Sequence, residues 1–114
     1  MARFELGAAA DIPSNSMRAF PVGGRRVLVV NLDGEWCALD DICPHLAVPL
    51  NRGELKDGCV ICPGHGSVFA VRTGEVKRWV GKPVTWLTRL TEGRPTSART
   101  YPVTVESGQV IVEL

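Results

Sequence analysis

Short apolar runs separated by turn residues set the pattern of this chain. The runs are rich in valine, isoleucine and leucine, and glycine, proline, aspartate or asparagine stands between them, which is typical of β-strands joined by tight turns. The pattern therefore predicts an all-β protein. Strands are expected over residues 4–6, 17–21, 25–31, 36–39, 59–61, 68–71, 99–105 and 109–113.

Two-residue turns are predicted where a glycine follows a small polar residue or another glycine. Asp33-Gly34 is the strongest of these signals, because both residue types accept the positive φ angles that a type I′ hairpin requires. Gly23-Gly24 and Ser107-Gly108 predict hairpins of the same kind. From 77 to 98 the pattern is irregular, and residues 83–90 fit either a short strand or a helical turn.

The length of 114 residues suits one domain, expected to span 1–114. Thirteen basic and twelve acidic side chains give a net charge of +1, which does not indicate binding to nucleic acid or to an anionic membrane. No apolar run approaches membrane-spanning length and no export signal is seen, so we expect a soluble, cytoplasmic protein. Two of the four cysteines have the spacing of metal ligands, so free cysteines in a reducing compartment are favoured over two disulfides.

Two short pairs of metal-binding residue types carry the candidate chemistry. Cys43-Pro44-His45 and Cys62-Pro63-Gly64-His65 are separated by sixteen residues, and they contain both of the histidines in the chain. Two thiolates and two imidazoles suit either a [2Fe–2S] cluster or a tetrahedral zinc ion. The Cys-x-His spacing is not the Cys-x2–4-Cys pair of zinc fingers, so the cluster is favoured.

The neighbours of these ligands suit a redox cluster. Pro44 and Pro63 limit φ beside a ligand, while Gly64 and Gly66 allow backbone N–H groups to approach the sulfides. With two neutral imidazoles the oxidised cluster has a formal charge of roughly zero, so an added electron costs less than in an all-thiolate cluster. An imidazole can also bring its outer edge to the surface, so His45 and His65 are the expected electron port.

Beyond the ligands, the chain resembles Rieske-type ferredoxins over most of residues 27–114. It looks most like the small soluble ferredoxin components of bacterial ring-hydroxylating dioxygenases, and it is also similar to the small subunit of NAD(P)H-dependent nitrite reductase. The residues that carry the resemblance are Cys43-Pro44-His45, Pro49-Leu50, Gly53, Leu55, Gly58, Cys62-Pro63-Gly64-His65-Gly66, Phe69, Arg72-Thr73-Gly74 and Tyr101-Pro102-Val103.

The resemblance implies the Rieske fold of three stacked antiparallel sheets, with a cluster-binding subdomain of two loops at about 41–74. It implies iron ligation by four residues, with Cys43 and Cys62 on one iron and His45 and His65 on the other. Residues 84–98, which include Trp86, look like an insertion relative to the compact ferredoxins.

Three positions bear on the branch of the family. Val48 and Gly64 stand where high-potential Rieske proteins carry two further cysteines, so the resemblance favours the soluble, low-potential branch. Ser67 resembles the high-potential branch, in which a serine hydroxyl bonds a sulfide, and this implies a potential somewhat above that of typical soluble relatives.

The function implied is that of a monomeric one-electron carrier, which takes an electron from a flavin-containing reductase and passes it to a terminal oxygenase. Nothing in the sequence supplies an open iron position, a 2-His-1-carboxylate site or a nucleotide-binding fingerprint, so the chain is not expected to be an enzyme itself.

Two alternatives stay open at this stage. The first is a Rieske subunit docked permanently in a nitrite reductase or a similar oxidoreductase, for which the basic insertion with Trp86 would form the interface. The second is a metal-independent binding module, which would be colourless and free of iron. Trp79 and Trp86 fit either a packing role or contact with a partner.

Five other side chains are assigned structural roles. Cys37 and Cys59 are predicted to be small buried hydrophobes, and Trp36 and Phe69 are predicted to pack in the core. Arg72 is predicted to be a hydrogen-bond donor at the hairpin rather than a contact for a substrate.

Overall fold

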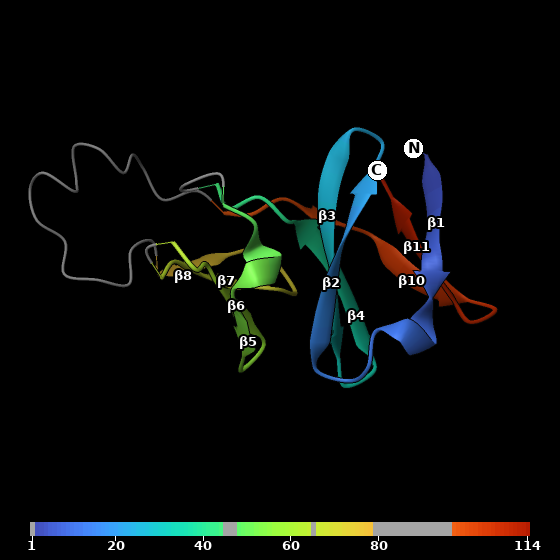
Figure 1. Cartoon of the computed structure of the whole chain (residues 1–114), viewed down its shortest axis with the longest axis horizontal. Coiled ribbons are helices and arrows are strands. Elements are labelled where there is room, and N and C mark those ends of the chain that lie inside the picture. Colours follow the sequence, from blue (N-terminus) through green and yellow to red (C-terminus); the bar gives the residue numbers. More distant parts are fainter. Residues whose placement is uncertain (1, 45–47, 65, 79–96) are drawn as a thin grey trace, which may run out of the picture.

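The computed structural model describes residues 2–44, 48–64, 66–78 and 97–114. These residues form strands and two short 3-10 turns, arranged in three antiparallel sheets (Figure 1). The sequence-based prediction of an all-β chain with three stacked antiparallel sheets is confirmed. Among the described residues, no helix is long and apolar enough to cross a membrane.

The first sheet joins the two ends of the chain. Its strand order is β1-β11-β10, and Ala2 and Leu114 exchange backbone hydrogen bonds of 3.2 and 3.0 Å at its edge. A 3-10 turn, η1, leads from β1 toward the middle sheet. The bounds are β1 (Arg3–Ala8), η1 (Ala9–Asp11), β10 (Val103–Glu106) and β11 (Gln109–Glu113).

The middle sheet has the order β2-β3-β4-β9 and contains the longest strands. Asp33 and Gly34 join β3 to β4 with φ angles of 52° and 94°, so the predicted type I′ turn is confirmed. Short β9 returns from much later in the sequence and pairs with β4. The bounds are β2 (Ser16–Val22), β3 (Arg25–Leu32), β4 (Glu35–Asp40) and β9 (Thr100–Tyr101).

One predicted strand is divided in the structure. The sequence predicts a single strand over 99–105, but β9 ends at Tyr101 and β10 begins at Val103. Pro102 lies between them and has no N–H group, so the ladder of hydrogen bonds is interrupted there. The two halves consequently join different sheets, β9 the middle sheet and β10 the first.

The third sheet carries the loops of interest and has the order β5-β6-β7-β8. Strands β5 and β8 are absent from the sequence-based prediction, because each is three residues long and exposes charged side chains. The bounds are η2 (Leu50–Arg52), β5 (Glu54–Lys56), β6 (Cys59–Ile61), β7 (Val68–Ala70) and β8 (Val76–Arg78).

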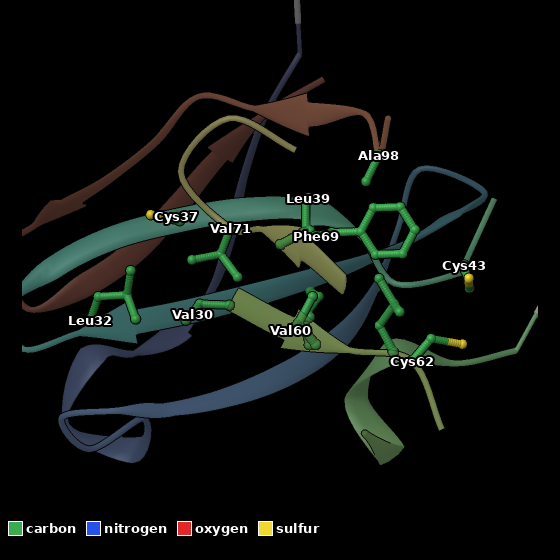
Figure 2. Close-up of a cluster of buried hydrophobic side chains, with 12 residues drawn as sticks. Val30, Leu32, Cys37, Leu39, Cys43, Val60, Cys62, Phe69, Val71 and Ala98 are labelled. Atoms are coloured by element: carbon green, nitrogen blue, oxygen red, sulfur yellow. The ribbon is translucent and has the colours of Figure 1, made fainter. Parts of the chain in front are cut away.

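Strand β3 is buried on both faces, and this explains its unbroken apolar sequence. Leu28 and Val30 pack into a first core, which lies between the middle and third sheets and includes Phe69 (Figure 2). Val27 and Val29 point the other way, into a second core shared with β11. Each fully buried side chain of this size contributes about 1.5–3 kcal/mol to folding.

The predicted core roles are partly confirmed. Phe69 is fully buried, Cys37 lies in the first core, and Trp36 packs half-buried against the second core. Cys59 is only half-buried, because on β6 it points to the face opposite the one by which Val60 enters the core. Arg72 donates from Nε to Glu35, so its predicted role as a structural donor is confirmed.

The segments before and after residues 79–96 are bonded to each other near Gly74. The N–H of Ala98 donates to the carbonyl of Gly74 at 2.8 Å, and the N–H of Val76 donates to Ser97 Oγ at 3.3 Å. Residues 84–96 of the predicted insertion, together with Trp79 and Trp86, lie outside the described residues.

Candidate metal centre

The first candidate ligand loop leaves the middle sheet at the end of β4. Its two sides run antiparallel: Ile42 and Pro49 form a β-bridge, and the N–H of Cys43 donates to the carbonyl of Val48 at 2.9 Å. Below this bridge the N–H of Leu50 donates to the carbonyl of Asp41 at 2.6 Å. Cys43 is therefore held on a loop with a closed base.

The second candidate loop is the connection between β6 and β7. Cys62 follows β6 directly, and its N–H donates to the carbonyl of Ser67 at 2.8 Å. The N–H of Gly66 donates back to the carbonyl of Cys62 at 3.2 Å, which tightens the turn. Ser67, the residue before β7, is fully buried. The hairpin thus fixes Cys62 at the point where the loop leaves β6.

The two loops bring Cys43 and Cys62 to the same end of the first core. Each cysteine is 1% exposed, and Figure 2 shows both beyond Phe69, at the end opposite Leu32 and Cys37. The four cysteines of the chain form no disulfide with one another. Two enclosed thiols, from separate loops that meet at one place, are a donor arrangement that fits an iron–sulfur cluster.

The two histidines of the predicted ligand set, His45 and His65, lie outside the described residues. Each follows its cysteine by two or three positions in the sequence. The structure therefore places one donor of each predicted pair, Cys43 and Cys62, and the assignment of all four ligands stays a prediction.

Cys37 has a different environment from these two thiols. Burial raises its pKa above the ordinary thiol value, and the nearby Glu35 carboxylate raises it further, against the opposing effect of Arg72. The thiol is therefore protonated and unreactive near neutral pH. A cleft of about 380 Å³ lies beside it, and the described residues that line it include Trp36, Arg72 and Tyr101 but neither Cys43 nor Cys62.

Two consecutive aspartates precede the first loop, Asp40 as the last residue of β4 and Asp41 directly after it, and the contacts of neither are predicted from the sequence. Asp40 accepts a hydrogen bond from the Tyr101 hydroxyl, and burial together with this bond raises the pKa of Tyr101. Asp41 is fully buried and is bonded to Arg26 and Asn51. The only signal in the sequence is the position of two acidic residues directly before a ligand loop.

Comparison with known protein families agrees with this geometry. Residues 2–97 match the family model described as the Rieske [2Fe-2S] domain, so the chain belongs to this family. Membership implies a [2Fe–2S] cluster as the cofactor, and it confirms the resemblance to Rieske-type ferredoxins.

Individual relatives of the chain include a ferredoxin component of a dioxygenase and a much longer protein. The chain is 36% identical over 77 residues to the ferredoxin component of biphenyl 2,3-dioxygenase from Rhodococcus jostii (strain RHA1), which covers 68% of the chain and 72% of that protein. It is also 39% identical over 71 residues to apoptosis-inducing factor 3 from Mus musculus, covering 62% of the chain. The chain spans only 12% of the length of that longer protein.

Two solved structures share the fold over nearly the whole chain. A ferredoxin from Sphingomonas yanoikuyae B1 is similar with a TM-score of 0.79 and 26% identity, over 99% of both chains. A carbazole 1,9a-dioxygenase complex of reduced oxygenase and oxidised ferredoxin contains a chain similar with a TM-score of 0.76 and 26% identity, over 96% of this chain and 91% of that one.

Proposed function

We propose that this protein is a one-electron carrier. The bound cluster supplies a single-electron redox step, at a potential above that of an all-thiolate cluster. The observation that carries the proposal is the meeting of Cys43 and Cys62, both buried and from separate loops, at one end of the first core.

The proposed ligands are the four residues of the sequence motif, Cys43 and Cys62 on one iron and His45 and His65 on the other. The buried cysteines would hold the inner iron, and the histidines would carry the electron to and from the surface. We propose one domain over 1–114, with the cluster-binding subdomain at about 41–74.

The proposed partners are a flavin-containing reductase and a terminal oxygenase, which bind in turn to a monomer in the cytoplasm. The names of the relatives support this, since they include a dioxygenase ferredoxin component and a complex of ferredoxin with oxygenase. The surface beside the buried cysteines also suits transient contact: Ile42 is 36% exposed, and Pro44 and Pro63 are exposed as well.

Metal analysis tests the carrier directly. Iron and acid-labile sulfide should each be present at about two per chain, and dithionite should convert the protein to a form with an electron paramagnetic resonance signal from one unpaired electron. A single zinc ion per chain, or colourless protein after expression with iron and sulfide supplied, would contradict the proposal.

Reconstitution tests the partners. The reduced protein should be reoxidised by an oxygenase with substrate present, and it should be reduced again by a flavin reductase with NADH. Purification from the source cells should yield a monomer. A large flavin- or haem-containing subunit that co-purifies in constant ratio would instead favour the docked subunit of a nitrite reductase or similar oxidoreductase.

A further inference from the structure

Asp40 and Asp41 are adjacent but face different surroundings. Asp40 is half-buried and accepts from the Tyr101 hydroxyl, on the side of the middle sheet where β9 pairs. Asp41 has no exposed surface and belongs to the base of the first ligand loop. The two residues carry the same charge, so they allow the effect of position to be separated from the effect of charge.

The carboxylate of Asp41 uses both oxygens to bind the far side of the loop. Oδ1 accepts from the backbone N–H of Asn51 at 2.9 Å, and Oδ2 accepts from Asn51 Nδ2 at 2.8 Å. Oδ2 also accepts from Nε of Arg26 on β3 at 3.2 Å. A buried carboxylate is stable only when its lone pairs are satisfied in this way.

These bonds close the loop that presents Cys43. The loop runs from Asp41 to Asn51, and its two ends are joined by the Asp41 carboxylate and by the bond from Leu50 N–H to Asp41 carbonyl. The bridge of Ile42 with Pro49 and the bond from Cys43 to Val48 follow toward the tip. The carboxylate is thus at the base of the ladder that positions the thiol.

The charge of Asp41 also lies close to the candidate centre. Asp41 is two residues before Cys43 and is fully buried, whereas its partner Arg26 is 49% exposed in its side chain. Water screens the exposed guanidinium more strongly than the buried carboxylate. The net effect at the centre is that of a negative charge.

We infer that Asp41, together with Asn51, is a positioning residue for the metal centre. Its carboxylate holds the first ligand loop closed around Cys43, and its buried charge disfavours the reduced, more negative state of the cluster. The inference rests on the proposed function, since it takes Cys43 as a ligand of a redox cluster.

The substitution Asp41→Asn tests the inference at nearly constant volume. Both carboxylate oxygens accept from donors, so either orientation of the amide places its NH2 group against an N–H group. Asp40→Asn is the matched control, because the amide oxygen still accepts from Tyr101 and the same formal charge is removed one residue away.

Three measurements on the holoprotein give the result. In Asp41→Asn, bleaching of the visible absorbance by excess chelator should be roughly tenfold faster than in the wild type and in Asp40→Asn, as expected for the loss of a charge-assisted hydrogen bond. The midpoint potential should rise, and by more than in Asp40→Asn. The backbone amides of Cys43 and Leu50 should exchange hydrogen with solvent faster in Asp41→Asn than in the wild type and in Asp40→Asn.

A bleaching rate equal to that of Asp40→Asn, or an unchanged potential, would overturn the inference. If Asp41→Asn does not fold, Asn51→Ala decides, because it removes one of the three donors to the Asp41 carboxylate and keeps the charge of Asp41. Faster bleaching at a near wild-type potential supports the inference, and a wild-type rate overturns it. If the wild-type protein holds no cluster, the proposed function fails, and the exchange of the Cys43 amide still tests loop closure.

Discussion

At the scale of single residues, Cys43 and Cys62 differ from the side chains next to them. Both thiols are enclosed, while Ile42, Pro44 and Pro63 beside them are exposed. Enclosure lowers the effective dielectric constant around a bound cluster, so the charge of each ligand has a large effect on its potential. The exposed neighbours leave an apolar edge at which a partner can approach.

Replacing a histidine ligand by cysteine should lower the midpoint potential. His45→Cys or His65→Cys adds a thiolate charge at the cluster, and each is expected to lower the potential by roughly 100 mV or more if the cluster is retained. Voltammetry of the purified variants measures this. Val48→Cys, which adds a thiol to the first loop without changing a ligand, should stay near the wild-type value. An unchanged potential in a histidine variant that keeps its cluster would disprove the ligand assignment.

Tyr101 should make the stability depend on pH in the alkaline range. Burial and the bond to Asp40 raise its folded-state pKa above the ordinary value. The resulting stabilisation is fully present below the unfolded pKa of about 10 and is lost as the pH rises through the folded-state pKa. The free energy of unfolding, measured by urea denaturation, should therefore fall more steeply above pH 10 in the wild type than in Tyr101→Phe.

The same variant has an expected effect near neutral pH. Tyr101→Phe removes the donor to Asp40, and a loss of about 1 kcal/mol at pH 7 is expected. Equal slopes of stability against pH in the two proteins above pH 10 would show that Tyr101 does not ionise on unfolding in that range.

At the scale of elements, the third sheet is tied by a close backbone contact to the segment that leads into β9. A Cβ atom on Gly74 would lie 2.0 Å from the carbonyl oxygen of Ala98, and Gly74 has φ of 75°. Only glycine fits both conditions. The hairpin between β7 and β8 therefore depends on this residue for its contact with the chain that leads into β9.

The variants Gly74→Ala and Gly108→Ala separate two costs of adding a Cβ atom: the steric clash with Ala98 and the strain of a positive φ angle. Gly108 also has φ of 75°, but a Cβ atom there meets nothing within 4 Å. Gly108→Ala should cost about 1 kcal/mol, and Gly74→Ala about 2–4 kcal/mol. Urea denaturation of both variants measures the difference. Equal losses would mean that the chain at Ala98 moves away without cost.

The elements differ in how well the sequence predicts them. Long strands of the middle sheet and the turn at Asp33-Gly34 follow from local signals, since apolar runs and positive-φ residues act within a few positions. Strands β5 and β8 pair with the adjacent strands β6 and β7, but each has three residues, two of them charged and exposed, so no apolar pattern marks them. Pro102 is present in the sequence, but the strand predicted over 99–105 does not allow for a break there or for the transfer of β10 to another sheet.

The same distinction applies to the candidate site. The cysteine and histidine types and their spacing identify the ligand motif, because few other chemistries need them together. The bonds from Asp41 to Arg26 and Asn51 join three segments that are brought together only by folding. A sequence shows the charge of Asp41 but not its burial.

At the scale of the whole molecule, the two cores share the middle sheet. Val30 of β3 packs in the first core with Cys43 and Cys62, and Val29 of the same strand packs in the second. Neither core is complete without β3, so the three sheets should unfold together.

Val29→Ala tests this coupling across the sheet. It removes two buried methyl groups from the second core, and a loss of about 2 kcal/mol is expected. Far-ultraviolet circular dichroism and the visible absorbance of the cluster should shift to lower urea concentration by the same amount, as in the matched variant Val30→Ala. A shift in circular dichroism alone would show that the cores unfold independently.

The backbone bonds between Ala2 and Leu114 place both ends of the chain on the first sheet. The middle sheet stands between that edge and the loops with Cys43 and Cys62 (Figure 1). A tether, a fluorophore or a fused protein module attached beside Ala2 or Leu114 would therefore leave uncovered the surface next to Cys43 and Cys62. Immobilisation on an electrode through these residues would orient that surface toward the solution.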